Sequence, residues 1–334
     1  MTWGDRACAI ATGTGVDHEM YQPLTDWRLS RRALLSGVTS VAVASILTAC
    51  SRSANSGEDG AGSRLKIVAA ESFWGSIAAQ LGDNFVDVTS LITNPDTDPH
   101  DFEPKPSDAR IVADARYVIL NGAGYDPWLQ SLIDANPANK RKILNVGNLV
   151  GKKRGDNPHL WYNPAFVDHV IERIAQDLSV LDPTHADAIA QRRQQFSGSD
   201  LKPYHDLIDA IKTSYGGTKI GSTESVFLYM AEALGLDLIT PSGFMNAISE
   251  GNDVTAADKA AVDRQISDKQ IAVLVYNTQN ATPDTEAVKQ KATANGIPVV
   301  GITETLNPPG ATFQAWQVQQ LTDLQQALAA GTGR

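Results

Sequence analysis

Short apolar runs that alternate with amphipathic stretches constrain the fold of this chain more than any other feature of its sequence. Such runs are typical of buried strands, and the stretches between them, for example residues 72–81, 107–115 and 126–135, have the pattern of covering helices. The runs form two groups of four: residues 65–69, 86–92, 117–120 and 142–146, and residues 219–221, 236–239, 271–276 and 297–302. We therefore predict an α/β fold with two (β/α) lobes, each built on a parallel four-stranded sheet.

A long helical region lies between the two groups of strands. Apolar residues recur at helical spacing from Phe166 to Leu181, and Pro183 ends that run. Residues 184–215 have the pattern of a further long helix with a weak point at Ser197-Gly198-Ser199. We predict an N-terminal lobe over residues 64–182, a linking backbone helix over 183–215 that acts as a stiff hinge, and a C-terminal lobe over 216–330. Two ordinary consecutive helices are the alternative.

The N-terminus indicates export. Arg31 and Arg32 precede an uncharged stretch, rich in small residues, that runs to Ala49 and is short for a membrane-spanning helix. This pattern predicts a signal peptide over residues 1–49, exported by the twin-arginine or the Sec route. The residues Leu47-Thr48-Ala49-Cys50 resemble the bacterial lipobox, in which the cysteine is lipidated. A flexible tether over residues 50–63 would then connect a lipid on Cys50 to the folded body, on the outer face of the cytoplasmic membrane.

Cysteine content and charge exclude several classes of site. The chain has only Cys8 and Cys50, so the exported body would hold no disulfide and no thiolate metal site. Any metal ligands must therefore be nitrogen and oxygen atoms. The net charge is −10 without a marked basic cluster, which argues against a nucleic-acid partner.

Two histidines occur in similar, stiff sequence frames. His100 lies in Asp98-Pro99-His100-Asp101-Phe102-Glu103-Pro104, and His159 lies in Asn157-Pro158-His159-Leu160-Trp161. In both frames a proline restricts the backbone just before the imidazole. Two rigidly presented imidazoles from distant segments suggest a metal site, although each could be an unrelated loop histidine. His169, His185 and His205 are expected to be solvated.

With these motifs in place, the chain resembles the substrate-binding lipoproteins of bacterial zinc and manganese ABC importers. The resemblance runs from about Lys66 to Leu328, and its most specific parts are the His100 segment, residues 121–128 and His159-Leu160-Trp161. It implies two (β/α) lobes joined by one long helix, with the metal in the cleft between them. It also implies a monomeric receptor that delivers a divalent cation to an ABC permease.

The resemblance implies a set of ligands. His100 and His159 match the family's first two histidine ligands, and Glu224, in Gly221-Ser222-Thr223-Glu224, matches the third, which is histidine or glutamate. By position alone, Glu224 could equally be a first-turn residue favoured by a helix dipole. Relatives often place a fourth, acidic ligand in the loop after the strand at 271–276. Here no carboxylate falls in the matching place; Asp284, about two residues later, is the candidate, and water or an amide oxygen of Gln279 or Asn280 is the alternative.

Two imidazoles and one carboxylate favour zinc, which is commonly bound by four ligands, over manganese, which prefers more oxygen ligands. The histidine-rich loop of many zinc-binding members is absent between His100 and His159, which weakens this prediction. The same ligands would suit a manganese or iron receptor, a secreted metallohydrolase or a metal-stabilised adhesin. A His-Glu-x-x-His motif, which would favour the hydrolase, is missing. We predict a receptor rather than an enzyme.

Overall fold

The computed structural model describes residues 64–95, 99 and 102–334. The predicted signal peptide, Cys50, the tether and His100 lie outside these residues. Within the described part of the chain, no helix combines the length and the apolar character needed to cross a membrane.

The first sheet contains four parallel strands in the order β2-β1-β3-β4. The strands are β1 (Leu65–Glu71), β2 (Val86–Ile92), β3 (Tyr117–Leu120) and β4 (Lys142–Asn145). The helices of this lobe are α1 (Ser72–Gly82), α2 (Pro106–Asp114), α3 (Pro127–Ala135) and the short α4 (Val146–Leu149). Strand β3 is buried along its whole length, as expected for an inner strand covered by helices on both faces.

The second sheet repeats this arrangement in the order β6-β5-β7-β8, again with all strands parallel. Its strands are β5 (Lys219–Ser222), β6 (Asp237–Leu238), β7 (Val273–Asn277) and β8 (Val299–Ile302). Its helices are α8 (Leu228–Ala233), α9 (Ser242–Ser249), α10 (Ala256–Ser267) and α11 (Pro283–Ala294). The predicted fold class, two α/β lobes with parallel four-stranded sheets, is confirmed.

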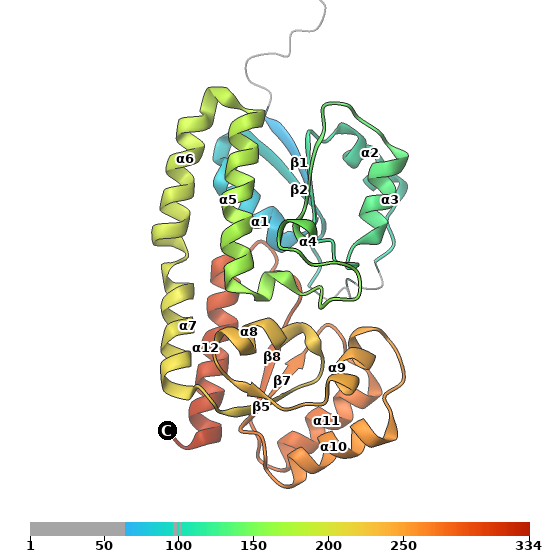
Figure 1. Ribbon diagram of the computed structural model, residues 1–334, viewed down its shortest axis with the longest axis vertical. Helices are drawn as coiled ribbons and strands as arrows, with labels where there is room; N and C mark the ends of the chain where they lie inside the picture. Colours follow the sequence, from blue (N-terminus) through green and yellow to red (C-terminus); the bar gives the residue numbers. More distant parts are fainter. Residues whose placement is uncertain (1–63, 96–98, 100–101) are drawn as a thin grey trace, which may run out of the picture. The chain divides into compact units, whose positions relative to one another are not determined.

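A long bent helix follows α5 (Pro164–Leu181) and connects the two sheets (Figure 1). It consists of α6 (Ala186–Gln195), one π-helical turn (Phe196–Asp200) and α7 (Lys202–Tyr215). The π turn falls on the predicted weak point at Ser197-Gly198-Ser199. A π turn is a common cause of a bend in a helix, so the linking helix is present but not straight.

A second helical connection between the sheets is made by α12 (Phe313–Thr332), which runs beside α7 (Figure 1). At its start, the backbone N–H of Phe313 donates to Oγ of Ser76 in α1 at 3.0 Å. Near its end, Gly331 packs so closely on the backbone of Ala272 that a Cβ atom would lie 2.1 Å from the Ala272 carbonyl oxygen. This helix therefore contacts the first lobe at one end and the second lobe at the other.

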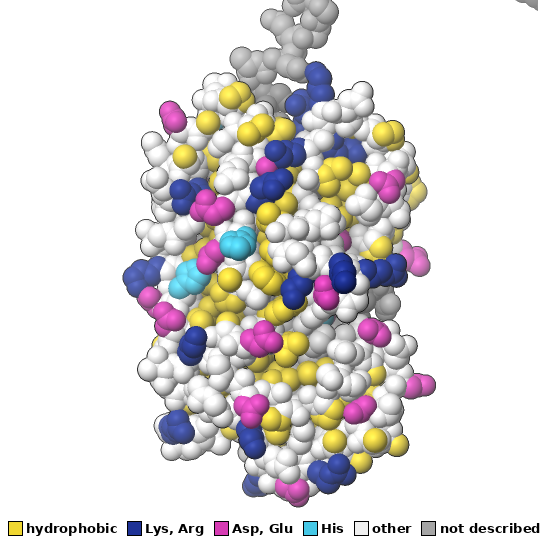
Figure 2. All heavy atoms as spheres, in the orientation of Figure 1, with side chains coloured by type: hydrophobic (Ala, Val, Ile, Leu, Met, Phe, Trp, Pro, Cys, Tyr) yellow, Lys and Arg dark blue, Asp and Glu magenta, His cyan; other side chains and the backbone are white. Residues whose placement is uncertain are grey.

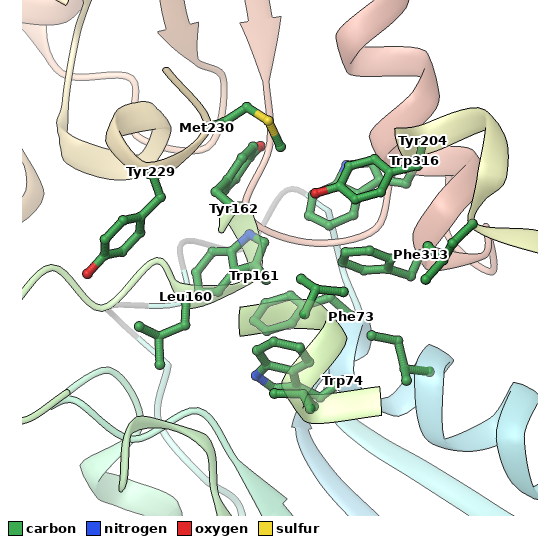
Figure 3. Packing of buried hydrophobic residues seen from close by; sticks show 14 of the residues in the cluster. Phe73, Trp74, Leu160, Trp161, Tyr162, Tyr204, Tyr229, Met230, Phe313 and Trp316 are labelled. Atoms are coloured by element: carbon green, nitrogen blue, oxygen red, sulfur yellow. The ribbon is translucent and has the colours of Figure 1, made fainter. Parts of the chain in front are cut away.

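An aromatic core fills the space where these segments meet (Figure 3). The ring of Phe73 in α1 stacks on that of Trp161, with 4.1 Å between the centroids. The hydroxyl group of Tyr162 donates to the carbonyl oxygen of Thr303 at 2.8 Å, and Nε1 of Trp316 donates to Oγ1 of Thr303 at 2.8 Å. The segment after His159 is thereby fixed against the end of β8.

Candidate metal site

His159 lies in the loop between α4 and a short 3-10 turn, Leu160–Tyr162, and its side chain is fully buried. Its Nδ1 atom lies 2.7 Å from Oδ1 of Asn157, which also accepts the backbone N–H of His159 at 3.1 Å. Because an amide oxygen only accepts hydrogen bonds, this contact places the imidazole proton on Nδ1. In the neutral imidazole the lone pair is then on Nε2, and this tautomer can bind a metal ion through that atom.

Asn157 also connects His159 with the second lobe. Its Nδ2 atom donates to the carbonyl oxygen of Ser225 at 2.8 Å, and its backbone carbonyl oxygen accepts from the hydroxyl group of Tyr229 at 3.0 Å. Ser225 directly follows Glu224, so a single asparagine contacts one predicted ligand and the neighbour of another.

Glu224 follows β5 in an extended conformation, and its side chain is fully buried. Its Oε2 atom accepts hydrogen bonds from Oγ of Ser249 and Nδ2 of Asn280, both at 3.3 Å. Its Oε1 atom accepts from Nδ2 of Asn277, the last residue of β7. The carboxylate is thus held by donors from α9 and from the end of β7 with the loop after it.

A second buried carboxylate, Glu304, joins this group, and sequence reasoning missed it. Its Oε2 atom lies 3.3 Å from Nε2 of His159 and accepts from the hydroxyl group of Tyr125 at 2.7 Å. Its Oε1 atom accepts from Nδ2 of Asn277 at 2.7 Å. Glu304 comes two residues after β8, at the carboxyl edge of the sheet that also carries Glu224. The one signal for it in the sequence is its place two residues after a predicted strand, at the carboxyl edge where parallel sheets bind ligands.

Gln279 holds the Glu304 segment in place. Its Oε1 atom accepts the backbone N–H groups of Glu304 and of Thr305, the latter at 3.0 Å, and its Nε2 atom donates to Oγ1 of Thr305 at 2.9 Å. The amide oxygen suggested above as a ligand therefore contacts backbone groups instead. Asn280 turns its Nδ2 atom, a donor, towards Glu224.

The structure does not bring Asp284 into this group. Asp284 lies in the first turn of α11 with 38% of its side chain exposed, and its carboxylate pairs with Nζ of Lys259. An acidic residue in the first turn of a helix is favoured by the exposed backbone N–H groups there. The carboxylate that approaches His159 is that of Glu304, which follows β8 rather than β7.

A cavity of about 980 Å³ lies beside the site. Its lining includes Tyr125, Asn157, Ser249 and Asn280, each of which hydrogen-bonds to His159 or to one of the two carboxylates. Among the described residues, which exclude His100, no three His, Cys, Asp or Glu side chains form a cluster suited to a metal ion. Convergence of His159, Glu224 and Glu304 on one ion would therefore require these side chains to move.

Of the other described histidines, His169 is exposed, and His185 and His205 are half-buried near the surface. His185 pairs with Asp182 at 2.7 Å, and Nε2 of His205 lies 3.5 Å from Oδ1 of Asp168. The hydrogen bond to Asp168 raises the pKa of His205. On the face drawn in Figure 2, cationic and anionic side chains are interspersed.

Glu71 and Asp126 form a separate buried pair of carboxyl groups in the first lobe. Both side chains are at most 1% exposed, and Asp126 accepts the backbone N–H groups of Asn121 at 2.6 Å and Gly122 at 2.8 Å. Burial raises the pKa of Asp126 to about 6, and burial followed by the charge of Asp126 raises the pKa of Glu71 well above its usual value. Two adjacent buried carboxyl groups resist double ionisation, so the pair retains a proton in mildly acidic solution.

Known metal-binding proteins resemble this chain in sequence. Residues 67–327 match the family model described as "Zinc-uptake complex component A periplasmic". The manganese ABC transporter substrate-binding lipoprotein PsaA of Streptococcus mitis is 25% identical over 262 residues, which are 71% of this chain and 80% of that protein. The manganese-binding lipoprotein MntA of Halalkalibacterium halodurans is 28% identical over 191 residues, 54% of this chain and 61% of that protein. The chain thus spans less than two thirds of MntA.

Solved structures share the fold. The crystal structure of ZnuA aligns with a TM-score of 0.63 at 21% identity, covering 80% of this chain and all of that chain. A cadmium-bound periplasmic metal-binding protein from Candidatus Liberibacter asiaticus aligns with a TM-score of 0.66 at 18% identity, covering 79% of this chain and all of that chain.

Proposed function

The chain belongs to the family of periplasmic zinc-uptake component A, whose members are metal-binding receptors of ABC importers rather than enzymes, and on this premise we propose that it captures Zn²⁺. The observation that carries this proposal is the contact of His159 with Glu304, with Asn277 linking Glu304 to Glu224. We assign His159, Glu224, Glu304 and the predicted ligand His100 as the metal-binding residues.

The charges and the number of these donors suit zinc. Ionised carboxylates at Glu224 and Glu304 carry two negative charges, which one divalent cation balances. Two imidazoles and two carboxylate oxygens form a four-donor set of nitrogen and oxygen atoms, as in tetrahedral zinc sites. A manganese receptor of the same architecture is the second candidate, because the relatives PsaA and MntA are named for manganese.

Metal analysis of the purified full-length protein, followed by competitive titration with zinc and manganese, tests the proposal. We expect one zinc ion per chain and a zinc affinity that falls when His159 or Glu224 is replaced by alanine. A chain that binds neither metal, or that binds both unchanged after both substitutions, contradicts the assignment.

Delivery to the permease would use both lobes. His159 belongs to the first lobe and Glu224 and Glu304 belong to the second, so an ion bound to all three bridges the lobes and favours the conformation in which the donors converge. Two helical connections, the α6–α7 helix and α12, favour small movements of the lobes over a wide closure. Structures with and without zinc that differ by a large hinge rotation would contradict this expectation.

We also propose that the receptor is a monomer held on the outer face of the cytoplasmic membrane by a lipid on Cys50. Radiolabelled fatty acid should be incorporated into the expressed protein, and Cys50→Ser should abolish the labelling. Labelling that persists in the variant contradicts the anchor without affecting the metal site.

A further inference from the structure

Asn277 occupies the position between the two carboxylates of the site. It is the last residue of β7, it is 1% exposed, and its backbone N–H donates to Oγ1 of Thr223 at 3.2 Å. Its Oδ1 atom accepts the backbone N–H of Gln279 at 3.0 Å. Because the amide oxygen is held by a backbone donor, the NH₂ group must point the other way, towards Glu224 and Glu304.

The NH₂ group of Asn277 donates to one oxygen of each carboxylate, the Oε1 atom in both cases. Its Nδ2 atom contacts Oε1 of Glu304 at 2.7 Å and also contacts Oε1 of Glu224. The second oxygen of each glutamate has other neighbours: Oε2 of Glu304 lies 3.3 Å from Nε2 of His159, and Oε2 of Glu224 accepts from Ser249 and Asn280, two residues of the cavity wall. An ion bound by Nε2 of His159 would therefore meet Oε2 of Glu304 rather than the Oε1 atom that Asn277 holds.

This arrangement opposes bidentate coordination, because a carboxylate that gives both oxygens to the ion must release its hydrogen bond to Asn277. Each glutamate then supplies one oxygen, which keeps the number of oxygen donors around the ion small. Zinc is commonly bound in this way, at four-coordinate tetrahedral sites. Manganese prefers more oxygen ligands and a higher coordination number.

We propose that Asn277 determines the metal specificity of the site by limiting Glu224 and Glu304 to one oxygen each, and thereby selects zinc over manganese. The inference rests on the proposed function, since it concerns the same ion and the same ligands. Asn277 acts through the carboxylates, so it is a positioning residue and not a ligand.

The test is a competitive titration of the full-length protein with Zn²⁺ and with Mn²⁺, in the wild type and in two variants. Asn277→Ser removes the NH₂ group from both carboxylates. Asn246→Ser, the matched control, removes an exposed amide from α9 in the wall of the same cavity. We expect the ratio of the manganese to the zinc dissociation constant to fall about tenfold in Asn277→Ser and to stay unchanged in Asn246→Ser. A tenfold change is typical when a residue that hydrogen-bonds to a metal ligand is replaced.

A purely structural role of Asn277 would weaken both metals alike and leave the ratio within about twofold of wild type, which overturns the inference. X-ray absorption of the wild-type zinc complex gives a test that does not depend on the variant's folding. Four nitrogen and oxygen neighbours at about 2.0–2.1 Å support the inference, and five or more overturn it. If the wild type binds neither metal, the proposed function itself fails, whereas normal zinc binding with an unmoved ratio defeats only the role of Asn277.

Discussion

The Nε2 atom of His159 lies 3.3 Å from Oε2 of Glu304, although the two residues belong to different halves of the chain. His159 follows β4 of the first sheet, and Glu304 follows β8 of the second. Each is fixed by its own set of neighbours: Asn157 holds the imidazole, and Tyr125 and Asn277 hold the carboxylate. This one contact joins the two lobes at the place where we propose that the metal binds.

Replacing Glu304 should therefore weaken zinc binding more than replacing Asp284. Glu304→Gln removes a charged oxygen donor, and we expect the zinc dissociation constant to rise by about a hundredfold, equivalent to about 2.7 kcal/mol. Asp284→Asn breaks only a partly exposed pair with Lys259 and should leave the constant within about twofold. Chelator competition with both variants measures the difference. A larger effect at Asp284 than at Glu304 would restore the ligand first predicted after β7.

The orientation of His159 should depend on Asn157. Asn157→Leu has a similar volume but leaves Nδ1–H of the buried imidazole without its acceptor, and it also removes the bond to Ser225. We expect zinc affinity to fall by about 10- to 100-fold, as is usual when the partner of a metal-binding histidine is lost. Stability of the metal-free protein should fall by about 1–3 kcal/mol in urea unfolding.

A matched variant separates these two effects. Asn148→Leu replaces an exposed asparagine in α4. The backbone N–H of residue 148 donates to the capping side chain of Asn145, and the substitution leaves this hydrogen bond in place. It should change neither zinc affinity nor the urea midpoint appreciably. If Asn157→Leu destabilises the fold but binds zinc as tightly as wild type, Asn157 does not orient the ligand.

Trp161 should report binding through its fluorescence. Its ring is fully buried, and its centroid lies 5.4 Å from that of His159 in an edge-to-face arrangement. A cation placed on the imidazole changes the electric field at the indole, so the emission intensity of the wild type should change on zinc addition. Trp161→Phe should remove most of this change while preserving zinc affinity, since Phe retains an aromatic ring against Phe73. An undiminished signal in the variant would assign the change to another tryptophan.

The sequence predicts the strands of this protein well because apolar residues such as those of β1, β3 and β7 are gathered between clear breaks. It predicts the bend in the linking helix because Gly198 and its serine neighbours are weak helix formers. The helix α12 is harder to recognise as a second connection. Its buried face repeats at helical spacing, but Gln317 and Gln320 stand on that face and interrupt the apolar pattern.

The residues of the site also differ in how well the sequence predicts them. Glu224 could be proposed from its motif, and the structure places it in a buried set of hydrogen bonds with Asn277 and Ser249. Glu304 could not be ranked above other acidic residues, because its approach to His159 depends on how β8 lies against the first lobe. A short motif can indicate which residue is a ligand. Which residues of the two lobes lie close together depends on how the lobes pack, and a short motif does not predict that.

The buried carboxyl pair of Glu71 and Asp126 should make stability depend on pH. Burial raises the pKa of Asp126 from 3.8 to about 6, and it also raises that of Glu71, so the folded protein binds more protons than the unfolded chain in this range. The stabilisation from the pair is therefore complete below pH 3.8 and is lost as the pH rises through about 6, by about 3 kcal/mol for Asp126 alone. Glu71→Gln removes one charge and should lessen this loss, whereas Glu103→Gln, an exposed control, should not. Urea midpoints of the metal-free protein between pH 4 and pH 8 measure the slope, and equal slopes in wild type and Glu71→Gln would show that the pair does not retain a proton.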